Sequence, residues 1–134
     1  MPAYTFAFSG FAVPDIDAAR TFYRDALGLS VTDAMMGQLS IDLPGGSWVL
    51  VYPKPDHTPA TYTMLNLEVD DIDAAVDELT SRGVVFDRYD GFEHDERGIV
   101  RGIAHNSGPD IAWCTDPAGN IISILQNPPE PSAE

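Results

Sequence analysis

The sequence predicts an α+β fold that is built from two copies of one β-α-β-β-β module. Residues 15–19 read DIDAA, and the same five letters recur at residues 71–75, which is 56 positions later. Each copy follows an apolar, strand-like run and begins a segment with helical periodicity. A chain of 134 residues fits one domain, with modules at about residues 3–55 and 60–127.

The repeated segments are predicted to begin helices. Asp15 and Asp71 are natural N-cap residues, because their carboxylates can accept hydrogen bonds from unpaired amides of the first turn. Apolar residues then recur at helical spacing on one face of each segment. Gly28 and Gly83 follow the last periodic residues and are typical stop signals. Both helices should therefore pack one face on a sheet.

The remaining apolar runs are predicted strands. Those of the first module are Phe6 to Val13, Leu29 to Ala34, Gln38 to Asp42, and Trp48 to Tyr52. Those of the second are Met64 to Val69, Val84 to Tyr89, Ile111 to Thr115, and Ile121 to Gln126. Residues 42–46 and 116–120 contain the Pro and Gly that hairpin turns require. Residues 90–109 form an insertion in the second module, and residues 128–134 form a flexible tail.

Two such modules resemble the vicinal-oxygen-chelate superfamily, the glyoxalase and bleomycin-resistance type. Its characteristic residues are FAVPD at 11–15, FYRDALGL at 22–29, LEVDDIDAA at 67–75 and DPAGN at 116–120. The resemblance implies curved mixed sheets that enclose a ligand cavity, in a homodimer. The family includes glyoxalases, epimerases, extradiol dioxygenases, thiol transferases acting on fosfomycin, and metal-free proteins that sequester antibiotics. Because one fold hosts many chemistries, the resemblance does not choose among these activities.

The composition limits the partners of this protein. Twenty-one acidic residues against seven basic ones give a net charge of −14, which repels nucleic acids and anionic membranes. The charge keeps the protein soluble and would also steer a cationic ligand toward it. With a single cysteine, Cys114, and with neither a secretory signal nor an apolar run of roughly 20 residues, we expect a cytoplasmic protein.

Strand alternation gives each sheet one aliphatic face, which should pack on a helix, and one mixed face. The mixed face combines aromatic, small and polar side chains, as small-molecule pockets do. Trp113 could stack on a ligand or fill the core. The predicted ligand-binding residues, for a small molecule with aromatic or cationic character, are Phe8, Trp48, Leu50, Tyr52, Met64, Asn66, Trp113 and Ser123.

The resemblance also locates the positions where metal-binding relatives carry their ligands. In this chain those positions hold Phe8, Leu50, Met64 and Ser123. Phe and Leu have no lone pair to donate, the thioether of Met prefers soft ions, and neutral Ser is a poor ligand. We therefore expect no metal and no cofactor, and the first interpretation is a metal-independent binding protein.

The second interpretation is an enzyme of the same fold, a lyase, an isomerase or a dioxygenase-like protein. Glu68 could accept a proton at the end of its strand. His94 and His105 of the insertion could serve as general acid or base if the insertion closes over the cavity. Together with Glu93, Asp95 and Glu96, these histidines could also form a relocated metal site.

Overall fold

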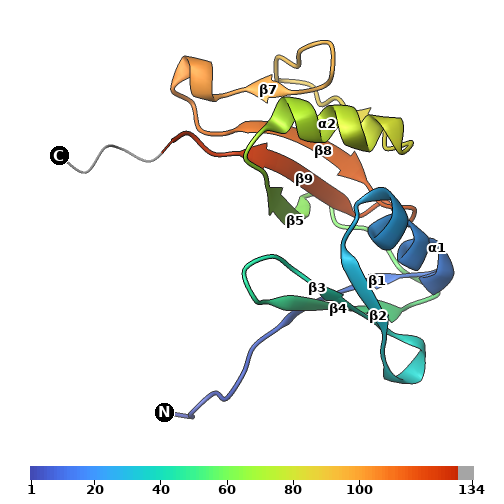
Figure 1. The fold of residues 1–134 in the computed structure, drawn as a ribbon. Coiled ribbons are helices and arrows are strands. Elements are labelled where there is room, and N and C mark those ends of the chain that lie inside the picture. Colours follow the sequence, from blue (N-terminus) through green and yellow to red (C-terminus); the bar gives the residue numbers. More distant parts are fainter. Residues whose placement is uncertain (130–134) are drawn as a thin grey trace. The chain divides into compact units, whose positions relative to one another are not determined.

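A computed structural model describes residues 1–129, so residues 130–134 of the predicted tail lie outside it. The chain divides into two units, Met1–Thr58 and Pro59–Glu134. Each unit contains one sheet with one helical segment on it (Figure 1). The α+β prediction with two β-α-β-β-β modules is confirmed. Within residues 1–129, no helix combines the length and the apolar character that crossing a bilayer requires.

The first unit is a four-stranded mixed sheet with strand order β1-β4-β3-β2. β1 runs parallel to β4, and the other neighbours are antiparallel. Its elements are β1 (Ser9–Val13), α1 (Ile16–Thr21), a π-helical segment (Phe22–Ala26), β2 (Ser30–Asp33), a 3-10 turn (Met35–Gly37), β3 (Leu39–Asp42) and β4 (Trp48–Pro53). The strand expected from Phe6 begins only at Ser9, which pairs with Val49, the second residue of β4.

The second unit is a five-stranded sheet with strand order β5-β9-β8-β6, in which β7 also pairs with β8. Its elements are β5 (Thr63–Glu68), α2 (Ile72–Ser81), β6 (Phe86–Asp87), β7 (Val100–Arg101), a 3-10 turn (Ile103–His105), β8 (Asp110–Thr115) and β9 (Ile121–Gln126). The strand predicted over 84–89 is reduced to two residues. The insertion supplies β7, which the sequence pattern did not predict.

The predicted helix caps are confirmed in both units. The carboxylate of Asp15 accepts a hydrogen bond from the Ala18 amide, and that of Asp71 accepts one from the Ala74 amide, each at 3.1 Å. Gly83 follows α2 with a φ of 92°, a left-handed conformation that favours glycine. These local signals set where each helix starts and ends, and thus which face it buries.

The core of each unit lies between its helix and one face of its sheet. In the first unit the largest fully buried side chains are Tyr23, Leu39, Ile41, Val13 and Val51. In the second unit Ile72 and Val76 of α2 are buried with Cys114 of β8 and Ile122 of β9. Because side chains alternate along a strand, their neighbours in sequence point to the opposite, open face. By this alternation Trp48, Leu50, Tyr52, Asn66, Trp113 and Ser123 lie on the face of their own sheet opposite its helix, and Ser123 is fully buried there.

Candidate ligand-binding site

One row of side chains crosses the open face of the second sheet. In register, Asn66 of β5 pairs with Ser123 of β9, Ser123 pairs with Trp113 of β8, and Trp113 pairs with Asp87 of β6. Laterally paired residues point to the same side of a sheet, so all four share this face. The row joins a hydrogen-bonding end, an aromatic centre and a carboxylate end.

The hydrogen-bonding end of the row is a pair of side chains. Ser123 is fully buried, and its hydroxyl donates to Oδ1 of Asn66 at 2.6 Å. This bond uses the carbonyl oxygen of the Asn66 amide and orients the group. The amide nitrogen of Asn66 has no protein acceptor among residues 1–129, and Asn66 is exposed. A donor is therefore available at the open face for an acceptor oxygen on a ligand.

Trp113 is the aromatic centre of the row. Its indole N–H donates to the hydroxyl of Thr63 on β5 at 3.1 Å, so the ring reaches across β9 and lies over the sheet. Tyr89 meets it edge-on with the ring centroids 5.5 Å apart, and Phe92 lies tilted at 5.5 Å. His94 is 6.1 Å away. The fixed indole and its aromatic neighbours form a preorganised stacking surface.

His94 is held by the insertion itself. Its Nε2 accepts a hydrogen bond from the Tyr89 amide at 3.0 Å, which requires that Nδ1 carries the proton. Nδ1 lies 2.9 Å from the carbonyl oxygen of Gly98 and donates to it. Both ring nitrogens therefore bond to backbone, and proton transfer to a ligand would break one of these bonds. In this geometry His94 positions the loop that carries Phe92.

A pocket of about 620 Å³ opens between the insertion and β8. This volume lies within the range of roughly 300–1,000 Å³ that is typical of small-molecule sites. The apolar walls come from Phe92, Ile111 and Trp113, and the rim includes His94 and His105. Thus the insertion that the sequence predicted as a loop supplies one wall of a pocket whose other wall is the sheet.

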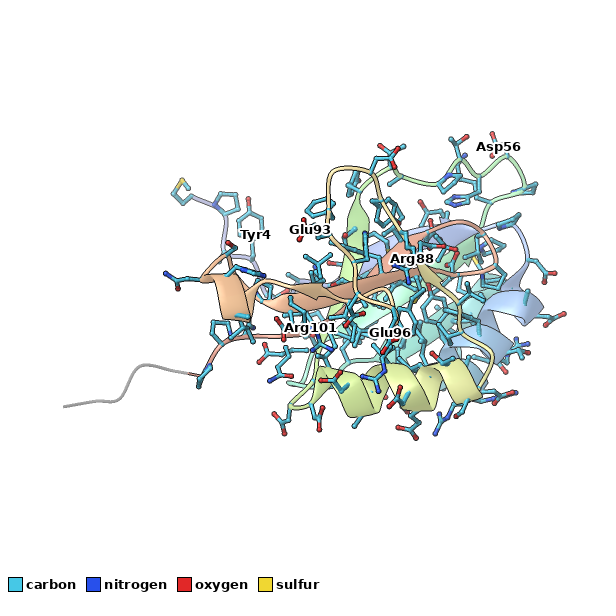
Figure 2. The ribbon with its side chains drawn as sticks, turned by 90° about the horizontal axis from the view of Figure 1, so that it is seen from above. Tyr4, Asp56, Arg88, Glu93, Glu96 and Arg101 are labelled. Atoms are coloured by element: carbon cyan, nitrogen blue, oxygen red, sulfur yellow. The ribbon has the colours of Figure 1, made fainter. Side chains whose placement is uncertain are left out.

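Ion pairs tie the insertion to α2, on the other side of the sheet from Trp113. The Arg101 guanidinium binds Asp73 of α2 and lies 3.0 Å from Oδ2 of Asp95 within the insertion. Arg97 binds Asp73 at 2.6 Å and Asp77 at 3.0 Å. Arg101 lies beside α2 in Figure 2. Its hydrogen bonds lower the pKa of the Asp73 carboxyl below its usual range. Asp95 thus serves as an anchor of the loop.

The predicted residues of the first unit form a separate aromatic surface. Phe8 stacks on Trp48 with the ring centroids 4.2 Å apart and the planes 14° apart. Leu50 and Tyr52 continue the same face of β4, opposite the buried Val51. Phe8 and Tyr52 are exposed, and Trp48 and Leu50 are half-buried. These four side chains form one apolar surface within the unit.

The other acid–base candidates lie away from the row. The carboxylate of Glu68 accepts a hydrogen bond from the side chain of Asn127 at 2.9 Å and is exposed at the end of β5. His105 lies in the 3-10 turn at the rim of the pocket and is also exposed. His94 and His105 both line the pocket beside Trp113, whereas Glu68 does not.

The side chains at the family's metal positions do not form a donor set in either unit. Phe8 is stacked on Trp48, and Leu50 has no donor atom. In the second unit the Ser123 hydroxyl is bonded to Asn66. Met64 lies where the pairing of β5 with β9 shifts by one residue, between Thr63 and Leu65. Across residues 1–129, no three or more His, Cys, Asp or Glu side chains gather in a way that could hold a metal ion.

Sequence reasoning missed three residues of this surface, namely Asp87, Tyr89 and Phe92. The signal for Asp87 was a single acidic residue inside a predicted strand, between Phe86 and Arg88. The sequence pattern predicts Tyr89 at the end of the same strand and Phe92 inside the insertion, without a contact to Trp113 for either. Their approach to Trp113 depends on how the insertion folds back, and spacing along the chain does not encode that.

Comparisons with known proteins place this geometry in a family. The model of the Glyoxalase/Bleomycin resistance protein/Dioxygenase superfamily matches residues 5–124. None of the curated proteins matches the chain in sequence. Among solved structures, TnmS3, an antibiotic binding protein from Streptomyces sp. CB03234, is 24% identical with a TM-score of 0.64. The similarity covers 95% of this chain and 100% of TnmS3.

Two further structures share the fold at lower identity. A glyoxalase/bleomycin resistance protein/dioxygenase from Alicyclobacillus acidocaldarius has a TM-score of 0.68 at 17% identity, over 92% of this chain and 91% of its own. The genomically encoded fosfomycin resistance protein FosX from Listeria monocytogenes has a TM-score of 0.65 at 11% identity, over 93% and 94%. The predicted resemblance is confirmed, and the chain belongs to the glyoxalase/bleomycin resistance protein/dioxygenase superfamily.

Proposed function

We propose that this protein is a metal-independent small-molecule-binding protein that holds an aromatic ligand against Trp113. The observation that carries the proposal is the indole of Trp113, fixed by Thr63 and bordered by Tyr89 and Phe92 next to a 620 Å³ pocket. Flat, rigid rings of this kind supply a large contact area at low cost in conformational entropy. A stacked aromatic ligand would use that area.

Polar groups beside Trp113 would orient the ligand. The amide nitrogen of Asn66, turned outward by its bond to Ser123, would donate to a carbonyl or hydroxyl oxygen of the ligand. In the first unit, Phe8, Trp48, Leu50 and Tyr52 offer a second aromatic surface of the same kind. Met64 lies within β5 of the second unit. A few polar groups within apolar walls is the usual composition of ligand pockets.

Metal independence is proposed from the donor chemistry. Three of the four family positions carry side chains without a hard donor, and the fourth, the Ser123 hydroxyl, is neutral and bonded to Asn66. Of the proteins with the same fold, TnmS3 is an antibiotic binding protein and FosX is a fosfomycin resistance protein. The antibiotic binding of TnmS3 supports a small-molecule-binding role for this chain, and we expect a cytoplasmic homodimer.

Nuclear magnetic resonance of the two indole N–H groups tests the proposal. The chain has two tryptophans, Trp48 and Trp113, so two side-chain cross-peaks are expected, and Trp48→Phe assigns them. Titration with 2-naphthylmethanol, a neutral planar probe, should shift the Trp113 cross-peak saturably. Phe92→Ala should weaken binding about tenfold, because it removes one aromatic wall. If the Trp113 cross-peak does not respond to the probe, the proposed site is wrong.

Val85→Ala is the matched control for Phe92→Ala. Both side chains are apolar and exposed, with 76% exposure for Val85 and 55% for Phe92, but Val85 does not line the pocket. Its affinity for the probe should equal that of the wild type. Metal analysis of the purified protein tests the second part of the proposal, since one tightly bound divalent ion per chain would contradict metal independence.

A further inference from the structure

Asp87 is a carboxylate at the end of the row that contains Trp113. Its Oδ2 is buried and makes no hydrogen bond within residues 1–129. Among the residues that the structure describes, no donor or cation reaches either oxygen. The side chain as a whole is half-buried, so it is partly covered by protein and partly open. Native proteins rarely leave a buried polar atom unsatisfied, and each instance calls for an explanation.

The nearest basic residue in sequence does not compensate Asp87. The guanidinium of Arg88 donates instead to the backbone carbonyl of Glu96 at 2.9 Å. Burial raises the pKa of the Asp87 carboxyl above its usual range. The charged form is therefore disfavoured in the unliganded protein, and a cation that reached it would be bound favourably.

Aromatic rings border the place where such a cation would bind. Asp87 and Trp113 are directly paired across β6 and β8 on the open face. Burial, together with the charge of Asp87, also raises the pKa of the nearby Tyr89 hydroxyl. The rings of Tyr89 and Trp113 lie 5.5 Å apart at 85°. An ammonium group next to aromatic faces gains a cation–π attraction in addition to its ion pair.

We propose that Asp87 binds a protonated amine on the aromatic ligand, with the ammonium group held against the rings of Tyr89 and Trp113. This inference rests on the proposed function and names the ligand class. Asn66 and Asp87 lie at opposite ends of the row, three strand spacings or roughly 14 Å apart. The ligand is therefore an elongated aromatic compound with an acceptor oxygen toward one end and an amine toward the other.

A matched pair of probes tests the role of Asp87. 2-Naphthylmethylamine is protonated at pH 7, whereas 2-naphthylmethanol has nearly the same shape and no charge. Titrations that follow the Trp113 indole cross-peak should give the amine an affinity about tenfold higher in the wild-type protein, equal to ~1.4 kcal/mol. In Asp87→Asn the two probes should bind equally, with the affinity for the alcohol unchanged.

Asp90→Asn is the control for long-range attraction by a protein of net charge −14. It removes the same unit charge three residues away, from an exposed position. We expect this variant to keep the tenfold preference for the amine. If Asp90→Asn abolishes the preference as completely as Asp87→Asn does, general electrostatics explains it and the role of Asp87 is wrong.

Thermal unfolding separates a recognition role from a structural one. Because the charged form of Asp87 is disfavoured in the folded protein, Asp87→Asn should unfold at a temperature equal to or above that of the wild type at pH 7. A clear decrease would identify a structural carboxylate and overturn the inference. If both probes shift Trp113 with equal affinity in the wild type, the inference fails while the proposed function stands. If neither probe shifts Trp113, the proposed function itself fails.

Discussion

Replacing Arg101 with Met should loosen the insertion from the helix beneath it. The Arg101 side chain is 32% exposed and contacts three carboxylates, those of Asp73, Asp95 and Asp110. Methionine keeps much of the apolar stem but removes the charge and every hydrogen bond of the guanidinium. Three carboxylates would then lie close together with less cationic compensation.

The expected loss of stability follows from this partial burial. Removing one partner from a buried ion pair costs about 3–5 kcal/mol, whereas exposed pairs contribute at most about 1 kcal/mol. Asp110 is 13% exposed, but Asp73 is 45% exposed, so the network lies between these limits. We expect a loss of about 2 kcal/mol in the free energy of unfolding, or a decrease of about 6 °C in Tm.

Circular dichroism during thermal unfolding measures this loss and its dependence on pH. Arg101 lowers the pKa of the Asp73 carboxyl in the folded protein. The pair therefore contributes stability above the unfolded pKa of about 4, and this stability is lost as pH falls through the folded pKa. The difference in Tm between Arg101→Met and the wild type should narrow from pH 7 to pH 3.

Arg24→Met is the matched control, because Asp25 is the one carboxylate within residues 1–129 that forms an ion pair with Arg24, and both side chains are more than half exposed. Its Tm should change by less than about 2 °C. The reasoning is refuted if the two variants lose the same stability at pH 7. It is also refuted if the deficit of Arg101→Met is as large at pH 3 as at pH 7.

Two further predictions concern the hairpin between β8 and β9. Burial raises the pKa of the Cys114 thiol to about 12. Iodoacetamide at pH 8 should therefore label this thiol only after the protein unfolds, as measured by mass spectrometry. Rapid labelling of the folded protein would contradict this. The Asp116 carboxylate accepts hydrogen bonds from the backbone amides of Ala118 and Asn120 and from the Asn120 side chain. Asp116→Ala should therefore lower the free energy of unfolding, measured with denaturant, by about 3 kcal/mol. Asp42→Ala, an exposed acid at the matching turn of the first unit, should change stability by less than about 0.5 kcal/mol; equal losses would contradict the assigned role of Asp116.

The sequence predicted the parts of the fold that depend on local chemistry. Capping by Asp15 and Asp71 requires contacts only three residues away, so a repeated pentapeptide was enough to place both helices. Alternation along β8 and β9 likewise indicated which side of the sheet Trp113 and Ser123 share. Both are properties of short segments, and short segments can be read from periodicity.

The contacts of the insertion could not be predicted in this way. Arg101 meets Asp73 across 28 positions of the chain, and Arg97 meets Asp77 across 20. No periodicity links residues so far apart, and charge alone allows many pairings. The register shift at Met64 could not be predicted either. A β-bulge inserts one extra residue into a strand, and no particular residue type marks its position. The 56-residue offset between the repeats therefore aligns Met64 with Phe8 in the sequence, but this alignment does not take the register shift of β5 into account.

The way the insertion is fastened has an evolutionary consequence. Arg97 and Arg101 form ion pairs with α2 on one face of the sheet. Residues 89–94 approach Trp113 on the opposite face. Substitutions at Phe92 or its neighbours can alter the shape and polarity of the surface around Trp113 without breaking the ion pairs that hold the insertion to α2. Under the proposed function, a few substitutions in this stretch would change which compounds bind, while the ion pairs of Arg97 and Arg101 keep the insertion attached to α2.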